Sequence, residues 1–268
     1  MPSAFAIFAQ PHDICFFAAG TLTLLRQNGW EIYCMALSSG ECASKVFGPQ
    51  QTIEIRVKEA MTAAQLLDAR FHGSPGKDFQ LLYEVESVRR VASTLRKVKP
   101  AIILTHSPEN DLEDHTGTAR TVVSAALVRS MPNFGTHPPS ESSDFETAIY
   151  HCVPQGIRDS MRRRVFSETY VDTGSVHERK RAALQAHASQ LTWSIETLGI
   201  NCLDAVDEMS RELGRMSGKF EHAEGWRRHS HQGLSRREID PLGEALSRHV
   251  SLNPAYGPAL DRGTYPSS

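Results

Sequence analysis

Two short polar stretches contain the residues whose types and spacing could do chemistry. In the first, Gln10, His12 and Asp13 place an amide, an imidazole and a carboxylate within four residues. In the second, Asp114 and His115 place a carboxylate beside an imidazole. A hydrolytic zinc site needs three protein ligands, usually His and Asp or Glu, and one position that is open to water. The two stretches together therefore indicate a site for metal-assisted hydrolysis. The alternative is that Asp13 only caps a helix and that His12 and His115 are surface residues in turns.

Each polar stretch follows a short apolar run and precedes a helical pattern. Strands that alternate with helices indicate crossover connections and a mostly parallel sheet, in which such corners meet at one edge. A short strand is also expected at residues 79–83. The main strands are expected at residues 4–9, 31–37, 101–105, 148–153 and 166–171, and the helices at residues 14–27, 51–67, 85–98, 116–131, 176–192 and 202–216.

The predicted fold is a Rossmann-like α/β fold with a mostly parallel sheet flanked by helices. Residues 1–226 are expected to form this domain, and residues 227–268 a polar C-terminal extension. The segment 132–145 is rich in Pro, Gly and Ser, which is typical of a mobile loop or lid. A nucleotide-binding protein is disfavoured because the first corner has no glycine-rich phosphate loop.

The composition is that of an ordinary globular protein. The 268 residues carry a net charge of −2, which gives no sign of bulk affinity for nucleic acid or membranes. No apolar run approaches the length of a membrane span, and no signal peptide is recognised. Five scattered cysteines indicate reduced thiols and a cytoplasmic location. A homo-oligomer is possible on these data.

The two corners resemble the signatures of the PIG-L/LmbE family of zinc-dependent N-deacetylases. That family opens with a strand followed by AHPDDIE and GGTL, and this chain has the segments AQPHDIC at residues 9–15 and AGTL at residues 19–22. Its later corner TH-x-P…DH is similar to residues 105–108 and 114–115. Weaker similarities extend the resemblance to about residue 226 and involve Ser39, Gly40, Glu41, Arg56, Glu59, Lys180, His187, Gln190, Arg211, Gly214 and Glu224.

The resemblance implies a zinc ion held at Asp13 and His115, with two departures from the family pattern in the first motif and a third at Leu112. Gln10 stands in the place of a ligand histidine, and His12 in the place of the aspartate that acts as general base. In one interpretation the turn shifts and His12 becomes the third metal ligand. In the other, Gln10 binds loosely or not at all and His12 is the base, for which histidine has a suitable pKa. Leu112 replaces a histidine that can stabilise the oxyanion.

The implied activity is removal of an acetyl or similar acyl group from an amino sugar or related small amine, with metal-bound water as the nucleophile. Asp114 is a further catalytic candidate, because it could orient His115 or lie beside that water, although it could also cap the following helix. His106 is expected to be a structural histidine at a strand end. The alternative function is that of a degenerate relative that binds a small ligand without hydrolysing it.

Overall fold

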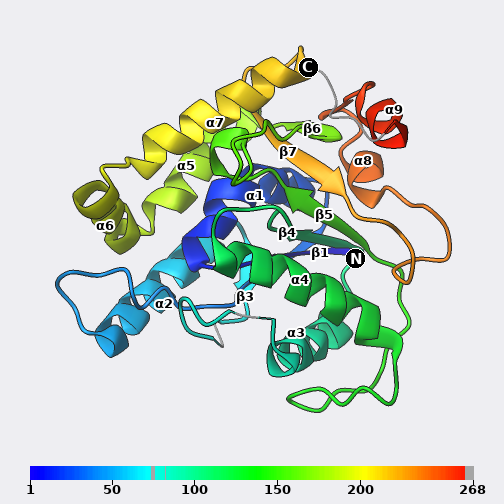
Figure 1. The fold of residues 1–268 in the computed structure, drawn as a ribbon, viewed down its shortest axis with the longest axis horizontal. Coiled ribbons are helices and arrows are strands. Elements are labelled where there is room, and N and C mark those ends of the chain that lie inside the picture. The colour runs from blue at the N-terminus through cyan, green and yellow to red at the C-terminus, as the bar shows by residue number, and fades with distance from the viewer. Residues whose placement is uncertain (74–75, 82, 263–268) are drawn as a thin grey trace.

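An eight-stranded mixed sheet forms the centre of the computed structural model, which describes residues 1–73, 76–81 and 83–262 (Figure 1). The strand order is β3-β2-β1-β4-β5-β7-β6-β8, with parallel pairing from β3 to β5 and antiparallel pairing beyond β5. The predicted α/β fold with a mostly parallel sheet is therefore confirmed. The strands are β1 (Ser3–Phe8), β2 (Glu31–Ala36), β3 (Ala69–Phe71), β4 (Ile102–Thr105), β5 (Ala148–Cys152), β6 (Thr169–Asp172), β7 (Ala223–Arg228) and β8 (Val250–Leu252).

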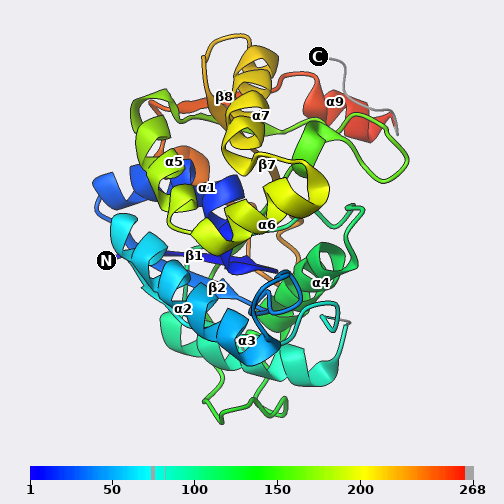
Figure 2. The same ribbon diagram turned by 90° about the vertical axis from the view of Figure 1, so that its left-hand side faces the viewer.

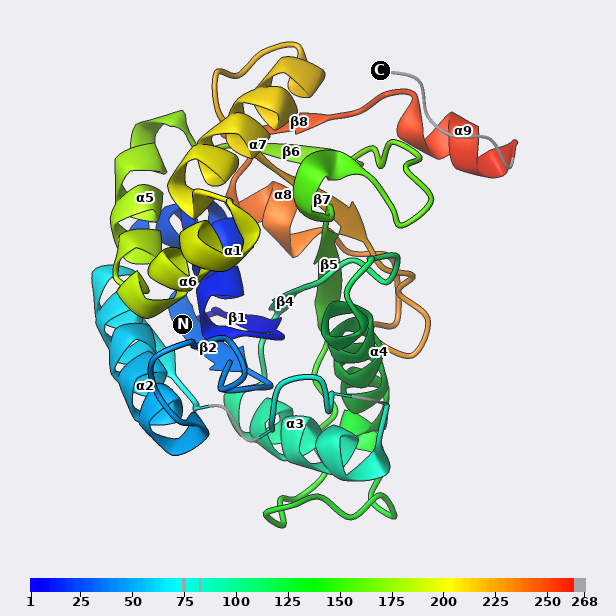
Figure 3. The same ribbon diagram turned by 60° about the vertical axis from the view of Figure 1, so that its left-hand side comes forward.

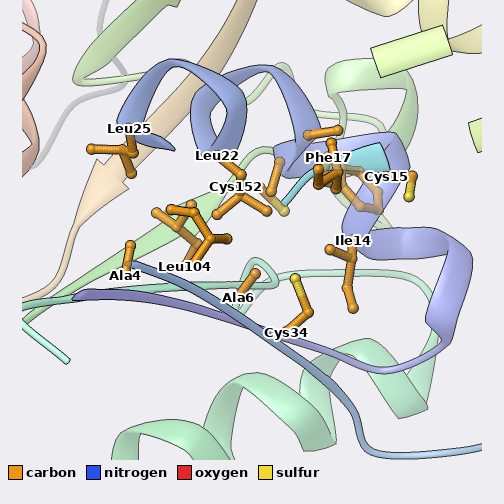
Figure 4. Close-up of a cluster of buried hydrophobic side chains, with 14 of the residues drawn as sticks. Ala4, Ala6, Ile14, Cys15, Phe17, Leu22, Leu25, Cys34, Leu104 and Cys152 are labelled. Carbon is orange, nitrogen blue, oxygen red and sulfur yellow. The ribbon is translucent and has the colours of Figure 1, made fainter. Parts of the chain in front are cut away.

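Helices cover both faces of this sheet (Figures 1 and 2). On one face, α3 and α4 pack against the β1 side chains Phe5 and Ile7. On the other, α1 and helices behind it pack against Ala4, Ala6 and Phe8 (Figure 4). The helices are α1 (Pro11–Gln27), α2 (Pro49–Leu66), α3 (Val85–Val98), α4 (Glu113–Leu127), α5 (His177–Gln185), α6 (Ala188–Leu198), α7 (Cys202–Ser217), α8 (Pro241–Ala245) and α9 (Tyr256–Asp261).

The central strands are apolar because both of their faces are covered. All six residues of β1 and all four of β4 are buried. Such strands read as continuous apolar runs rather than alternating patterns. In the described part of the chain, no helix is both long and apolar enough to cross a membrane.

Three expectations about elements differ from the structure. The helix expected at residues 176–192 is two helices, α5 and α6, which are separated at Ala186 and His187. The strand expected at residues 79–83 is absent from the described residues of that segment, which do not include residue 82, and β3 lies earlier in the chain. Asp13 caps the start of α1 as the third residue of a capping box, in which its carboxylate accepts the N–H of Gln10, and not as the N-cap residue itself.

The segment after residue 226 takes part in the fold. The expected boundary at residue 226 falls inside β7, and β8 extends the sheet by pairing with β6. Leu234, Leu242 and Leu246 are buried in the hydrophobic clusters of the main body. Because these side chains are separated by many polar residues, the sequence shows no periodic apolar face in this segment.

A buried ion pair joins α5 to β7, in the antiparallel part of the sheet. The Nζ atom of Lys180 lies 2.8 Å from Oε1 of Glu224, and both side chains are almost fully buried. The Glu224 carboxylate also accepts the backbone N–H groups of Gly20 and Thr21 at 2.8 Å. A Cβ at Gly20 would lie 2.5 Å from the Thr173 side chain, so only glycine allows this close approach.

Replacing Lys180 with methionine is expected to lower the free energy of unfolding by about 3–5 kcal/mol, because Glu224 keeps a buried charge without its cation. Urea unfolding measures this loss. The control is Lys58→Met on the exposed face of α2, for which we expect a change within about 0.5 kcal/mol. Equal stability of the two variants would contradict the prediction.

Candidate metal site and cavity

The two polar corners lie at the carboxyl ends of β1 and β4, which are adjacent parallel strands (Figure 3). Helix α1 begins at Pro11, directly after the first corner, and α4 begins at Glu113, after the second. Asp13 and His115 each lie in the first turn of their helix. The fold thereby brings these two side chains together across 102 positions of sequence, since the ends of parallel strands meet at one edge.

Three imidazoles surround the Asp13 carboxylate. Its Oδ2 atom lies 3.3 Å from Nε2 of His106 and 3.4 Å from Nε2 of His115. Its Oδ1 atom lies 3.5 Å from Nε2 of His12. The backbone N–H of Gln10 donates to Oδ2 at 2.8 Å, which fixes the carboxylate at the start of α1. The carboxylate is therefore the centre of the site.

The pKa shifts keep the carboxylate charged and two of the imidazoles neutral at pH 7. Burial alone would raise the pKa of Asp13, but the neighbouring imidazoles of His115, His12 and His106 hold it well below its usual range. Burial lowers the pKa of His12 to about 4, against the opposing effect of Asp13. Burial and the neighbouring His115 lower the pKa of His106 to about 3. A neutral imidazole keeps a free nitrogen lone pair for a metal ion or a proton.

The residues around Asp13 fit a zinc ion. One ligand atom from each of Asp13, His106 and His115 lies within 4.8 Å of the other two, and all three residues are buried. Zinc bonds of about 2.0–2.1 Å to nitrogen and oxygen place neighbouring ligand atoms roughly 3.3 Å apart in a tetrahedron. The measured separations of 3.3 and 3.4 Å from Oδ2 agree with this value. The donor set of one carboxylate and two imidazoles is also one that suits zinc.

His106 directly follows β4 and combines a hydrogen bond to the end of β1 with a place beside Asp13. Its Nε2 atom accepts the backbone N–H of Ala9 at 3.0 Å and also faces the Asp13 carboxylate. Its ring stacks on that of His115, with centroids 3.8 Å apart. Nε2 has a single lone pair, so ligation of a metal requires the Ala9 hydrogen bond to break. One feature of the sequence marks this residue, namely its place directly after an apolar strand.

Gln10 and His12 have separate environments. The side-chain amide of Gln10 donates to Oδ1 of Asp78 at 3.1 Å. The His12 side chain is 14% exposed and borders the cavity described below. Within the described residues, His12 does not belong to a group of three potential ligands whose atoms lie within 4.8 Å of one another.

Asp78 is a buried residue of this site that the sequence analysis missed. Its carboxylate accepts the Ser38 hydroxyl at 2.6 Å and the backbone N–H of Cys42 at 3.1 Å, in addition to the Gln10 amide. Asp78 thereby ties the loop after β2 to the first corner. It stands in a polar segment with no periodic pattern, so no sequence signal marked it.

Asp114 holds the loop that carries Asp78. Its two carboxylate oxygens accept the backbone N–H groups of Phe79 at 2.8 Å and Leu81 at 3.3 Å. Burial raises the pKa of Asp114, against the effect of these two hydrogen bonds. The Nδ1 atom of His115 is buried without a hydrogen-bond partner among the described residues, so Asp114 does not orient that ring. Asp114 lies in the second position of α4 and is not its N-cap.

Asp114→Asn is expected to lower the free energy of unfolding by about 1–2 kcal/mol, because an amide provides one acceptor in place of two. Hydrogen exchange at the backbone amides of Phe79 and Leu81 should become faster. Because this loop borders the cavity, KM should rise by a larger factor than the factor by which kcat falls. Asp111→Asn, at an exposed position of the same corner, is the control. Unchanged exchange at both amides would contradict the role of Asp114.

The site lies at the base of a cavity of about 340 Å³. This volume is within the usual range for small-molecule sites. Its charged side chains, apart from the histidines, are Asp13, Asp78, Glu113 and Asp114, and no described lining residue is Lys or Arg. The remaining described lining residues are Gln10, His12, Phe16, Phe17, Cys42, Ala43, Phe79, Leu112, His115, Gln155, Gln190, Trp193, Ser194, Leu198, Ile200 and Cys202.

A buried arginine supports the back of the cavity. Arg56 of α2 donates to the backbone oxygen of Ala43 at 2.9 Å and to the side chain of Gln190. Gly40 has a φ of +74°, and a Cβ there would overlap the guanidinium of Arg56. Glycine at position 40 therefore allows both the turn and the passage of this side chain.

Comparison with known sequences identifies one family. The family model described as PIG-L, GlcNAc-PI de-N-acetylase, matches residues 5–126, which include both corners. A 4-oxalmesaconate hydratase from Pseudomonas putida is 26% identical over 70% of this chain and 74% of its own length. A diacetylchitobiose deacetylase from Thermococcus kodakarensis is 24% identical over 81% of this chain and 79% of its own length.

Comparison with solved structures shows the same fold. The 4-carboxy-2-hydroxymuconate hydratase from Pseudomonas putida superposes with a TM-score of 0.73 at 20% sequence identity. The likeness covers 90% of this chain and 99% of that chain. The relatives thus include enzymes named as deacetylases and enzymes named as hydratases, and the choice between these reactions rests on the site.

Proposed function

Because residues 5–126 of this chain form a PIG-L family domain, we propose that the protein is a metal-dependent amide hydrolase. Its substrate in this proposal is an N-acylated amino sugar or a related small amine. The observation that carries the proposal is the buried group of Asp13, His106 and His115 at the base of a cavity. The predicted match to this family is confirmed, and the named deacetylases among the relatives support the reaction.

Asp13, His106 and His115 would hold the metal ion once the Ala9 N–H group releases the Nε2 lone pair of His106. A zinc ion bound there would lower the pKa of a water molecule toward neutrality and polarise the amide carbonyl. The third ligand in this assignment is His106, and His12 is left free for another role. The sequence-based alternative, in which His12 is the third ligand, is tested by the variants in the Discussion.

His12 is the proposed proton carrier. It is neutral at pH 7, borders the cavity and lies against Oδ1 of Asp13. A neutral imidazole can accept a proton from the attacking water and then deliver it to the leaving nitrogen. This role matches the place of the family's general base in the first motif, to which His12 corresponds.

The charges of the cavity favour an amine over a carboxylate. Hydrolysis of an amide releases an amine, which becomes an ammonium ion, and Asp78, Glu113 and Asp114 stabilise a positive charge. The hydratase relatives are named for carboxylate substrates. Apart from the metal ion, a polycarboxylate would find no cationic partner among the described lining residues, none of which is Lys or Arg. The site therefore supports amide hydrolysis better than hydration of such substrates.

The test is release of amine from N,N′-diacetylchitobiose and N-acetylglucosamine by tag-free protein. Zinc-loaded protein should release amine, protein treated with a chelator should not, and added zinc should restore the activity. A protein that carries about one zinc ion and cleaves no amide would contradict the proposal. A protein that takes up no zinc would favour the alternative of a relative that binds its ligand without hydrolysis.

The cysteines support a cytoplasmic location as part of this proposal. The five cysteines are free, and four of them are buried. Free thiols persist in reducing compartments.

A further inference from the structure

Exposed apolar side chains gather at the mouth of the cavity. Among the described residues, sixteen large hydrophobic side chains are exposed, and six of these border the site cavity or the cavity next to it. Isolated exposed apolar residues are common, but a contiguous group marks a binding surface. The six residues are Val46, Phe47, Phe79, Leu112, Leu198 and Ile200.

A second cavity continues the first toward the outside. It has a volume of about 230 Å³ and lies between the loop after β2 and helix α6, which are neighbours in Figures 2 and 3. Ala43 and Trp193 border both cavities, so the two spaces adjoin at these residues. Val46, Phe47 and Ile55 line the second cavity. Together the cavities form one continuous space, and the metal-site residues Asp13 and His115 border only the first of them.

Most of the carboxylates lie at one end of this space, since among the described lining residues the site cavity has four of them and the second cavity has only Glu196, with Lys45 as its cation. The carboxylates Asp13, Asp78 and Asp114 lie around the metal site, and the apolar side chains Trp193, Leu198 and Val46 border the path away from it. The nearest cation in the second cavity, Lys45, donates to the backbone oxygen of Glu196. An occupant that fits both ends has a polar head that becomes an amine and an apolar chain.

We propose that the substrate is an amphiphilic amide whose acyl part is an apolar chain several carbons longer than acetyl. The chain lies over Trp193 and extends toward Val46, while the amine part faces the carboxylates. Water adds to the carbonyl carbon, the C–N bond breaks, and a proton goes to the nitrogen, giving a carboxylic acid and an amine. This inference rests on the proposed amide hydrolysis and specifies its substrate.

A chain-length series tests the inference. The probes are N-acetyl-, N-butanoyl-, N-hexanoyl- and N-octanoylglucosamine, each used below its micelle concentration with zinc-loaded protein. Burial of each added methylene should raise kcat/KM by roughly two- to threefold, so octanoyl, with six more methylenes, should exceed acetyl by roughly 60- to 700-fold. Equal or falling kcat/KM along the series, with N-acetylglucosamine still cleaved, would overturn the inference and leave the proposed function intact.

Variants on α6 provide a matched comparison. Leu198 borders the site cavity. Leu198→Ser should reduce the ratio of kcat/KM for the octanoyl substrate to kcat/KM for the acetyl substrate, by a factor of up to about ten. Ile195→Ser, at an exposed residue of the same helix that borders neither cavity, should leave the preference unchanged. Equal effects of the two variants would overturn the assignment of this wall to the acyl chain.

A binding measurement distinguishes failure of this inference about the acyl chain from failure of the proposed amide hydrolysis. If no amide is cleaved, the proposed function fails, and calorimetric titration with N-octanoyl- and N-acetylglucosamine still tests the apolar path. Tighter binding of the octanoyl compound that is weakened by Leu198→Ser would support the inference. Equal affinity for the two compounds would overturn it.

Discussion

Replacing His115 with alanine is expected to remove nearly all bound zinc and to lower kcat/KM by about 10³-fold. The reason is the loss of one of the ligands to an ion that supplies several kcal/mol of charge stabilisation in the transition state. His115 lies 3.4 Å from Asp13 Oδ2 and is buried, so no solvent-exposed group takes its place directly. Elemental analysis gives the zinc content, and amine release gives the activity.

Two controls make this measurement specific. The tail histidines His229 and His231 could bind stray metal, so the same analysis is done on His231→Ala, which should keep about one zinc ion per chain. His137→Ala is a second control because its side chain is 67% exposed and faces Glu86. Full zinc content and full activity in His115→Ala would show that the two corners do not form the metal site.

The second prediction with a large effect distinguishes a histidine that binds the metal ion from a histidine that carries a proton. His12→Ala should lower kcat by roughly 10²- to 10⁴-fold with zinc content unchanged, because general acid–base catalysis contributes this much. His106→Ala should instead lose zinc, because His106 is the third member of the buried ligand group. Substitution of cobalt for zinc reports on metal ligation independently of catalytic activity, because the visible spectrum of bound Co²⁺ changes when a ligand is lost.

The opposite pattern would reverse the assignment. Loss of zinc in His12→Ala and retention in His106→Ala would mean that His12 is the third ligand, as one of the two sequence interpretations requires. The double variant Gln10→His/His12→Asp rebuilds the family's first motif and provides an internal standard. It should bind about one zinc ion and hydrolyse amides. Its Asp78 contact is lost with Gln10, so its stability is measured at the same time.

The sequence by itself determined the central parallel strands and the meeting of Asp13 with His115. The strands at residues 4–9 and 101–105 can be recognised in the sequence because strands buried on both faces are continuously apolar. The polar corners that follow them meet because adjacent parallel strands end at one edge. The helix at residues 85–98 is confirmed at both ends, since its apolar residues recur at helical spacing.

Only the tertiary structure decided which imidazoles face the Asp13 carboxylate. The direction of a side chain at a strand end depends on its packing, here the stacking of His106 on His115. Asp78 and Asp114 act through backbone and side-chain contacts with loops distant in sequence. Such contacts leave no periodic pattern, because the geometry that creates them arises only when the chain is folded. For the same reason the apolar path over Trp193, formed by segments more than 100 residues apart, has no signature in the sequence.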